Sequence, residues 1–353
     1  MASFQVSQSK VKKWRQCRRA YHYRYVEHLK RKIKSRPLSF GIIVHELLEF
    51  EGNRQDPFDK LDEIAGNMGK LFAAEREMYG ELIEDVRMIF EAYLDYWADQ
   101  PLNYIRWKGQ RTEHWIEIEL CDGITMVMKI DAFTRSKNKL QWLTEHKTGK
   151  NPLSIDDRWR NLQSAVYFRA CEIAGAPRLD GVLWNFIVSK PPTRPQILKS
   201  GGISTRQIVT LPAAVRQVIK ENKLDPKDSA CQNLLRQAEG SAAQYFQRDF
   251  TPLQPAVVDS IWTDFVSTCQ EMAERHGTSA ERTIDKHCSW CDYEPLCRAE
   301  LTGGDVDFVK EREYDNSQEN NQNDQKKVKQ TPAKGKAKRG GTGGKRSRRS
   351  PRS

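Results

Sequence analysis

The sequence predicts an α/β fold in which a small sheet is flanked by helices. Three observations predict it: amphipathic helical segments at the start, alternating strand patterns joined by tight turns near the middle, and further helices around another apolar strand. Helices that precede, interrupt and follow a few strands are typical of a sheet with helices packed on it. At 353 residues, the chain is long enough to bury a sizeable core.

Three helices are predicted in the first hundred residues. Ser7 or Ser9 can cap the first, because a serine hydroxyl accepts a hydrogen bond from an unpaired N–H of the first turn. Apolar residues recur at helical spacing in the second and third, and Pro101 follows the end of the third. The predicted helices cover residues 7–28, 41–51 and 82–97.

Strand patterns begin at residue 115. Apolar and polar residues alternate over 115–120, Asp122-Gly123 is typical of a hairpin turn, and residues 124–133 form the predicted return strand. A second turn at 136–139 leads into a strand over 140–147. The remaining predicted elements are a helix over 156–174, an apolar strand over 181–188 and a helix over 255–276.

Charge is distributed unevenly along the chain. Residues 1–36 contain 12 Lys and Arg against one acidic residue, and residues 326–353 contain 12 against none. The segment between them carries a net charge of −12, although the whole chain carries +11. Basic ends around an acidic middle suit a protein that binds a polyanion such as nucleic acid, whereas a basic helix face alone is often only solvated.

The predicted organisation has three parts. From about residue 312 the composition changes to Asn, Gln, Lys, Gly, Ser and Pro, which predicts a disordered basic tail over 312–353. A basic N-terminal helix occupies residues 1–36, and the main domain occupies 37–311. The tail can add salt-sensitive attraction to nucleic acid, or it can serve solubility or targeting.

Aromatic residues interleave with arginines in the N-terminal segment. This pattern suits a surface on which the bases of a single strand stack, but at helical spacing some of the rings must belong to the core. Both interpretations stay open from the sequence. The aromatic residues are Trp14, Tyr21, Tyr23 and Tyr25.

No segment has the roughly 20 consecutive apolar residues that a membrane-spanning helix needs. The first residues also lack the basic start and apolar stretch of a secretory signal. We therefore expect a cytoplasmic protein in a reducing compartment. The eight cysteines are then expected to be thiols or metal ligands rather than disulfides.

Asp131, Glu145 and Lys147 form a candidate site. Glu145 and Lys147 lie two residues apart on a predicted strand, so their side chains share a face, and the hairpin can bring Asp131 beside them. Converging carboxylates repel unless a cation joins them, and Mg²⁺ or Mn²⁺ takes oxygen ligands. A nearby lysine can position water and offset phosphate charge. Taken alone, such charges are more often exposed cross-strand neighbours.

Motifs on both sides of these residues support a hydrolytic site. In chain order they are G-x-x-x-H-x-x-L-E at 41–49, Ile130-Asp131, Glu145-His146-Lys147-Thr148-Gly149, and Q-x-x-x-Y at 163–167. Together they resemble the RecB-like branch of the PD-(D/E)xK nuclease superfamily, including its CRISPR-associated and AddB-type nucleases with an iron–sulfur cluster. The resemblance covers most of residues 5–300 and implies a restriction-endonuclease-like core, a small mixed sheet flanked by helices, with helical additions.

The resemblance also implies a role for each residue of the central motifs. The side chains of His45, Asp131 and Glu145 and the backbone carbonyl of His146 would bind Mg²⁺ or Mn²⁺. Lys147 would position the attacking water. The His146 side chain is expected on the opposite face of its strand, away from the catalytic group.

The flanking motifs are expected to support the site. Gln163 and Tyr167 would orient the scissile strand or hold the catalytic residues, and Glu49 lies one helical turn from His45. The family often has glycine two residues before the metal-binding Asp, whereas this chain has Lys129. Either the backbone there approaches its neighbour less closely, or Lys129 contacts DNA.

Cys288, Cys291 and Cys297 form a C-x-x-C pair followed by a third cysteine. Three thiolates at this spacing can converge on one metal centre from a loop, and spacing alone allows zinc or a [4Fe–4S] cluster. On spacing alone, Cys269 and His287 can also be ligands. The resemblance favours the cluster and gives Cys17 as the fourth ligand, which would tie residues 1–36 to the C-terminal cysteine loop of the nuclease domain.

The predicted function is a metal-dependent DNA nuclease, an exonuclease that hydrolyses phosphodiester bonds in single-stranded DNA or at frayed ends. Two alternatives stay open: a catalytically inactive nucleic-acid-binding module of the same fold, and an RNA-processing nuclease. The sequence has no phosphate-binding loop of a helicase motor, so unwinding would require a helicase or another recombination or replication partner.

Overall fold

The computed structural model describes residues 3–67, 73–278 and 280–316. At its centre is a mixed sheet with the strand order β1-β4-β5-β6-β7, to which β3 is added by pairing with β4. The α/β prediction, with a mixed sheet flanked by helices, is confirmed. The strands are β1 (Phe4–Val6), β3 (Thr112–Cys121), β4 (Ile124–Arg135), β5 (Gln141–Gly149), β6 (Gly181–Val188) and β7 (Phe246–Thr251).

The predicted hairpins form the centre of this sheet. β3 and β4 are antiparallel around Gly123, whose positive φ of 77° allows the tight turn. β4 and β5 are also antiparallel, whereas β5 and β6 are parallel and are joined by a helical crossover. β1 pairs in parallel with the first residues of β4, so the N-terminal segment contributes to the same sheet.

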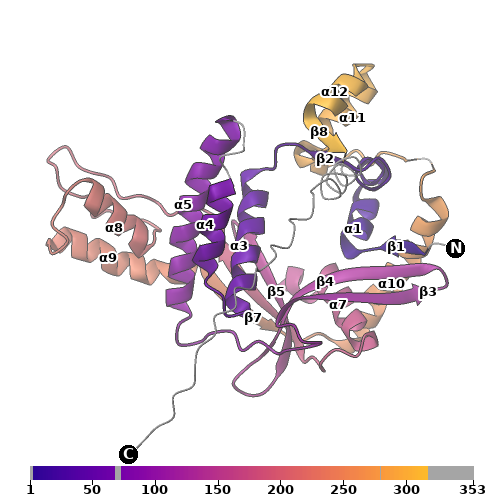
Figure 1. The fold of residues 1–353 in the computed structure, drawn as a ribbon, viewed down its shortest axis with the longest axis horizontal. Coiled ribbons are helices and arrows are strands. Elements are labelled where there is room, and N and C mark those ends of the chain that lie inside the picture. The colour runs from indigo at the N-terminus through magenta and orange to yellow at the C-terminus, as the bar shows by residue number, and fades with distance from the viewer. Residues whose placement is uncertain (1–2, 68–72, 279, 317–353) are drawn as a thin grey trace, which may run out of the picture.

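Helices pack on the sheet in two groups (Figure 1). The first group shares a hydrophobic cluster with β3 and β4 and consists of α1 (Gln8–Gln16), α7 (Leu162–Ile173) and α10 (Pro255–Arg275). The second group shares a cluster with the end of β6 and consists of α3 (Arg36–Gly52), α4 (Pro57–Asn67) and α5 (Ala73–Tyr96). Burial of these apolar residues is the main stabilising contribution to the fold.

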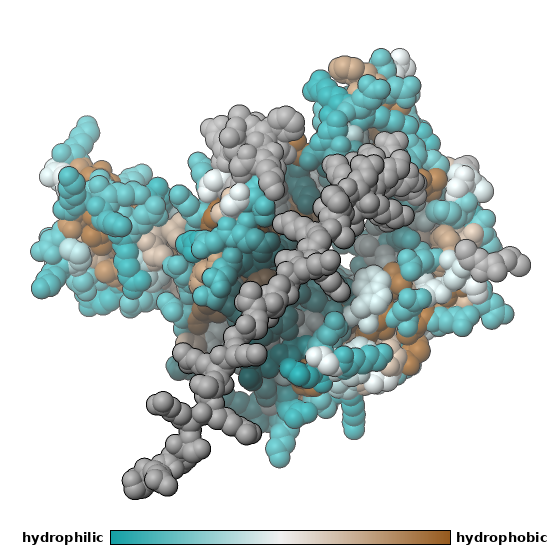
Figure 2. Space-filling view, viewed as in Figure 1, coloured by the Kyte–Doolittle hydropathy of each residue, from teal (hydrophilic) through white to brown (hydrophobic). Residues whose placement is uncertain are grey.

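Two further units extend from this core. Helices α8 (Pro212–Glu221) and α9 (Ser229–Ser241) are inserted between β6 and β7, pack on each other and project beside α5 (Figure 1). On the visible surface, their hydrophobic residues lie between hydrophilic ones (Figure 2). At the other side, α11 (Glu294–Thr302), α12 (Val306–Glu313) and β8 (Tyr314–Asn316) follow the cysteine loop, and β8 pairs with β2 (Leu29–Arg31).

Two predicted helices are interrupted. The first was expected over 7–28, but Cys17 is extended, with φ −166°, and separates α1 from α2 (Arg18–Tyr21) and a π-helical turn, η1 (His22–Val26). The Ser7 cap is confirmed, because its hydroxyl accepts a hydrogen bond from the backbone N–H of Lys10. The helix expected over 156–174 is split into α6 (Ile155–Trp159) and α7, because the Asn161 side chain caps a new helix start.

The C-terminal boundary also differs from the expectation. α12 and β8 extend to Asn316, past the predicted start of the disordered tail at residue 312. The tail's basic part, residues 326–353, lies outside the described residues. Among the described residues, no helix is long and apolar enough to cross a membrane.

Candidate active site

The site begins where β4 and β5 stop pairing. The register between these strands ends at Ala132 and Thr144. Two residues beyond Thr144, the backbone N–H of His146 donates instead to Oδ2 of Asp131, at 2.8 Å. The Asp131 carboxylate therefore takes the place of a main-chain acceptor and is fixed at an opening in the sheet. Burial raises the pKa of Asp131, while the charge of Lys147 and the His146 N–H oppose that increase.

A candidate metal-binding group lies at this opening. Ligand atoms of His45, Glu113 and Asp131 all lie within 4.8 Å of one another. Nδ1 of His45 is 3.7 Å from Oδ1 of Asp131. Burial, together with the charge of Lys147, lowers the pKa of His45, which favours the neutral imidazole that binds metals. One nitrogen and two carboxylates fit Mn²⁺ or Mg²⁺.

Glu113 is the site residue that the sequence motifs did not indicate. Its φ of 56° lies in the left-handed region, which is unfavourable for a side chain of this size by about 1–3 kcal/mol. Such strain persists where surrounding contacts hold the residue, and here Glu113 forms an ion pair with Lys129. Burial raises the pKa of Glu113, and the nearby carboxylates of Asp131 and Glu49 add to the increase. Glu49 therefore lies close to the group, as its position on α3 implied.

Glu145 lies deeper than this group and is almost completely buried. Its Oε2 accepts hydrogen bonds from Nζ of Lys147 at 3.0 Å and from Nε2 of Gln163 at 2.9 Å. Its buried Oε1 has no hydrogen-bond partner among the described residues. Burial raises the pKa of Glu145 to about 7, and the Asp131 charge adds to this increase although Lys147 opposes it. A buried oxygen without a partner beside another carboxylate fits a site that takes a cation.

Lys147 and Gln163 form a connected pair beside Glu145. Nζ of Lys147 donates to Oε1 of Gln163 at 2.9 Å, so Gln163 holds both ends of the Glu145–Lys147 ion pair. Burial lowers the pKa of Lys147, but the carboxylates of Glu145 and Asp131 outweigh it and raise the net value. Lys147 is therefore a cation. Tyr167 lies one turn further along α7, and burial together with these two carboxylates raises the pKa of its hydroxyl.

The His146 side chain lies on the other side of β5, as expected. Its Nδ1 is 2.9 Å from Nδ2 of Asn185, which also donates to the hydroxyl of Tyr93. The guanidinium of Arg248 donates to that hydroxyl and to Oδ1 of Asn185. The His146 ring contacts the His45 ring edge to face, with centroids 5.9 Å apart. This buried network fixes β5 behind the metal-binding group and supports the His45 ring.

A family model described as the PD-(D/E)XK nuclease superfamily matches residues 5–298 of the chain. The chain belongs to this superfamily. It is therefore a metal-dependent nuclease that hydrolyses phosphodiester bonds, and the carboxylate group at the sheet opening fits that chemistry.

No curated protein matches the chain. Among solved structures, it is similar to a candidate exonuclease from Eubacterium rectale, with 14% sequence identity and a TM-score of 0.34. That match covers 80% of this chain and 91% of the other.

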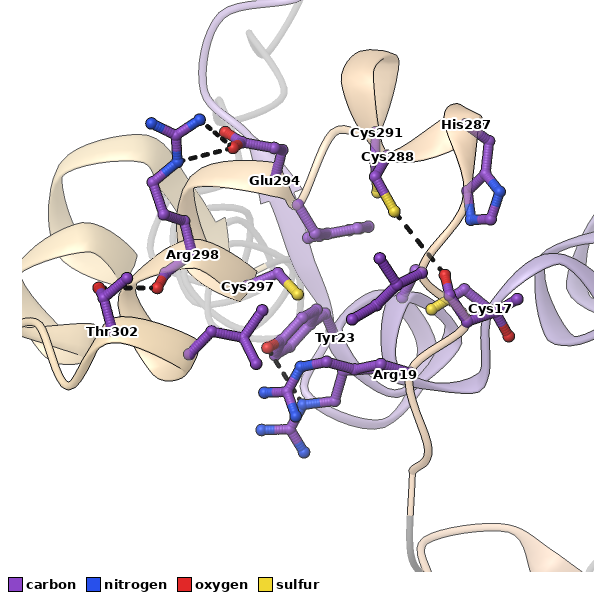
Figure 3. Close-up of a pocket in the computed structure, with 16 residues that line it drawn as sticks. Cys17, Arg19, Tyr23, His287, Cys288, Cys291, Glu294, Cys297, Arg298 and Thr302 are labelled. Carbon is purple, nitrogen blue, oxygen red and sulfur yellow. Dashed lines mark hydrogen bonds and ion pairs between the residues drawn. The ribbon is translucent and has the colours of Figure 1, made fainter.

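The nuclease also contains a cysteine-lined pocket (Figure 3). Cys17, Cys288, Cys291 and Cys297 all line one cavity of about 240 Å³. Cys17 reaches it from the break between α1 and α2, and the other three come from the loop around η4 (Lys286–Trp290) and from α11. No three of these sulfurs lie within 4.8 Å of one another. In the described part of the chain, only His45, Glu113 and Asp131 bring their ligand atoms that close together.

Cys269 and His287, the other two possible ligands of the cysteine site, lie in different places. Cys269 is fully buried in the cluster of α7, α10 and the sheet, and it does not line the pocket. His287 does line the pocket, and its buried Nε2 has no hydrogen-bond partner among the described residues. The structure therefore removes Cys269 from the candidates and keeps His287 beside the four cysteines.

Most of the N-terminal aromatic residues are buried, and two of the arginines beside them form ion pairs within the protein. Trp14, Tyr21 and Tyr23 are buried and belong to the hydrophobic clusters. Arg18 forms ion pairs with Glu271 and Glu281, and Arg19 pairs with Glu300. These contacts join the N-terminal segment to α10 and α11, so these three rings are not free to stack on nucleic acid.

We predict that Glu113→Gln weakens Mn²⁺ binding in the absence of DNA by at least about tenfold, because it removes one charged ligand. In wild-type protein, Mn²⁺ should raise the melting temperature, since it binds the folded state and offsets carboxylate repulsion. Calorimetric titration and thermal melting measure both effects. Glu117→Gln is the control, because Glu117 is an exposed residue of the same strand outside the group. Equal Mn²⁺ affinity in wild type and Glu113→Gln would exclude Glu113 as a ligand.

Proposed function

We propose that this nuclease is a DNA exonuclease that acts on single-stranded or frayed ends and carries a structural [4Fe–4S] cluster. The observation that carries the proposal is the group of His45, Glu113 and Asp131, with Lys147 and Glu145 behind it. The strained backbone of Glu113 and the buried carboxylate of Glu145 both lower the stability of the fold. A module that only binds nucleic acid needs neither feature, whereas a metal-dependent nuclease uses both.

Each side chain has a proposed role at the scissile phosphate. His45, Glu113 and Asp131 hold the divalent ion, and the unpartnered Oε1 of Glu145 is a further oxygen for it. The ion supplies Lewis-acid stabilisation of phosphate charge. The Lys147 ammonium positions the attacking water and offsets negative charge on the phosphate.

The remaining predicted residues hold this arrangement. The Gln163 side-chain amide forms hydrogen bonds with both Glu145 and Lys147 and so fixes their positions. Tyr167 lies one helical turn after Gln163 on α7. The backbone carbonyl of His146 stays a proposed metal ligand, at the point where β5 leaves β4. Glu49 acts through Glu113 and Lys129, near which its charge lies.

The exonuclease proposal predicts that Mn²⁺-loaded protein degrades linear single-stranded DNA and spares a single-stranded circle of the same sequence. Duplex DNA should become a substrate only at frayed ends or with a helicase partner. Gel analysis of both substrates and of RNA with the same sequence tests this expectation. Cleavage of the circle would make the protein an endonuclease, and preferential loss of RNA would favour the RNA-processing alternative. Intact substrates in every case would favour a binding module.

The [4Fe–4S] proposal rests on four thiols around a cavity of about 240 Å³, spaced more widely than the ligands of a single ion. A cluster has several metal atoms and suits such spacing better than zinc does. It would join Cys17 to the C-terminal cysteines and add to the ion pairs of Arg18 and Arg19 with α10 and α11.

We predict that Cys291→Ala lowers iron content and melting temperature together in anaerobically purified protein, because ligand binding is linked to folding. Cys231→Ala is the matched control, since Cys231 is buried in the α8–α9 unit and does not line the pocket. Iron analysis and thermal melting give the two readouts. Unchanged iron content in Cys291→Ala, or zinc in place of iron in wild type, would contradict the cluster.

A further inference from the structure

Trp115 is a large apolar side chain on an open face of the sheet. Along β3, residues 112, 114, 116 and 118 are buried, while Trp115, Glu117 and Glu119 between them are exposed. Ile116 and Ile118 of this buried set belong to the hydrophobic cluster that includes α7 and α10, on one side of the hairpin. Trp115 is on the other side and is 58% exposed. Its indole is therefore accessible on this side of the sheet, and its position relative to the metal-binding group decides what it can contact.

The exposed face of Trp115 is also the face of the metal-binding group. Trp115 lies two residues after Glu113 on β3 and opposite Lys129 on β4, and Lys129 lies two residues before Asp131. Opposite residues, and residues two apart on a strand, share a face, which places Trp115 with Lys129 and Asp131. The Lys129–Glu113 ion pair brings the Glu113 carboxylate to the same side, although the Glu113 backbone is left-handed. Trp115 therefore lies about 7 Å along the strand from Glu113.

The charges on this face limit where a nucleic acid strand can run. Lys129 lies opposite Trp115 and two residues before Asp131, whereas Glu117 and Glu119 occupy the face beyond Trp115. A phosphate backbone is attracted at the first position and repelled at the other two. The face therefore suits one base at Trp115, next to the metal-binding group, and does not suit a long tract along the hairpin.

We propose that Trp115 stacks on an unpaired base of the DNA strand, directly beside the phosphodiester held at the metal-binding group. The inference rests on the proposed DNA nuclease activity and adds a substrate-binding residue to it. In a duplex, the faces of an internal base are occupied by its stacked neighbours. Stacking on Trp115 therefore selects single strands or frayed ends, without selecting a particular base.

The test compares Trp115→Ala and Trp115→Phe with wild type on single-stranded DNA. Trp115→Ala should raise KM by about tenfold with little change in kcat, because stacking contributes to binding. Trp115→Phe should recover most of the affinity. Phe308→Ala is the matched control, since Phe308 on α12 is 56% exposed, and its KM should equal that of wild type. Thermal melting confirms that each variant folds.

An oligonucleotide series with a single abasic position makes the test specific. At one position next to the scissile bond, the abasic nucleotide should weaken binding to wild type by about tenfold and add nothing in Trp115→Ala. Fluorescence anisotropy in Ca²⁺ measures binding separately from hydrolysis. Unchanged affinity in Trp115→Ala, or equal abasic effects in both proteins at every position, would overturn the proposal.

The two proposals fail in distinguishable ways. If wild type hydrolyses DNA and Trp115→Ala has the same KM and the same affinity, the stacking proposal is wrong and the nuclease proposal stands. If wild type binds single-stranded DNA through Trp115 but hydrolyses none, the nuclease proposal is wrong and the stacking site stands. Absence of binding and hydrolysis in wild type overturns both.

Discussion

The hydrogen bond from the His146 N–H to the Asp131 carboxylate is the contact on which the site depends. The β4–β5 ladder ends at Ala132 and Thr144, and this bond gives the backbone donor beyond that end a partner. The strands can then separate, and the opening receives His45 from α3 and Glu113 from β3. A side chain thus replaces a main-chain acceptor, and the replacement brings a negative charge to the place where a metal ion is required.

Electrostatics then distinguishes this site from an ordinary buried ion pair. Glu145 has one basic partner, Lys147, yet the charge of Asp131 acts on it and Glu113 lies beside Asp131, and burial raises the pKa of all three carboxyl groups. One lysine does not neutralise three carboxylates, and the Glu113–Lys129 pair is at the edge of the group. A divalent cation supplies the missing positive charge. In the metal-free protein the carboxylates repel one another, and metal binding removes this repulsion.

The sequence predicted the parts of the site that depend on local spacing. Strand alternation and the turn at 136–139 place Asp131 beside Glu145 and Lys147, and helical spacing places Gln163 and Tyr167 on one side of α7. Glu113 could not be predicted, because it belongs to none of the motifs and nothing in the local pattern indicates its left-handed backbone conformation. The break at Cys17 was missed for a similar reason, since the helical pattern continues on both sides of that residue. β1 and β7 depend on pairing between distant segments, which local patterns do not reveal.

The most direct test of the account is Mn²⁺-dependent hydrolysis of a linear single-stranded oligonucleotide by wild type and Asp131→Asn. The amide oxygen of asparagine can still accept the His146 N–H, so the fold and the melting temperature of the metal-free protein should be preserved. Loss of the charged metal ligand should lower the hydrolysis rate at least about a hundredfold. Hydrolysis at the wild-type rate by Asp131→Asn, or no hydrolysis by wild type, would contradict the account.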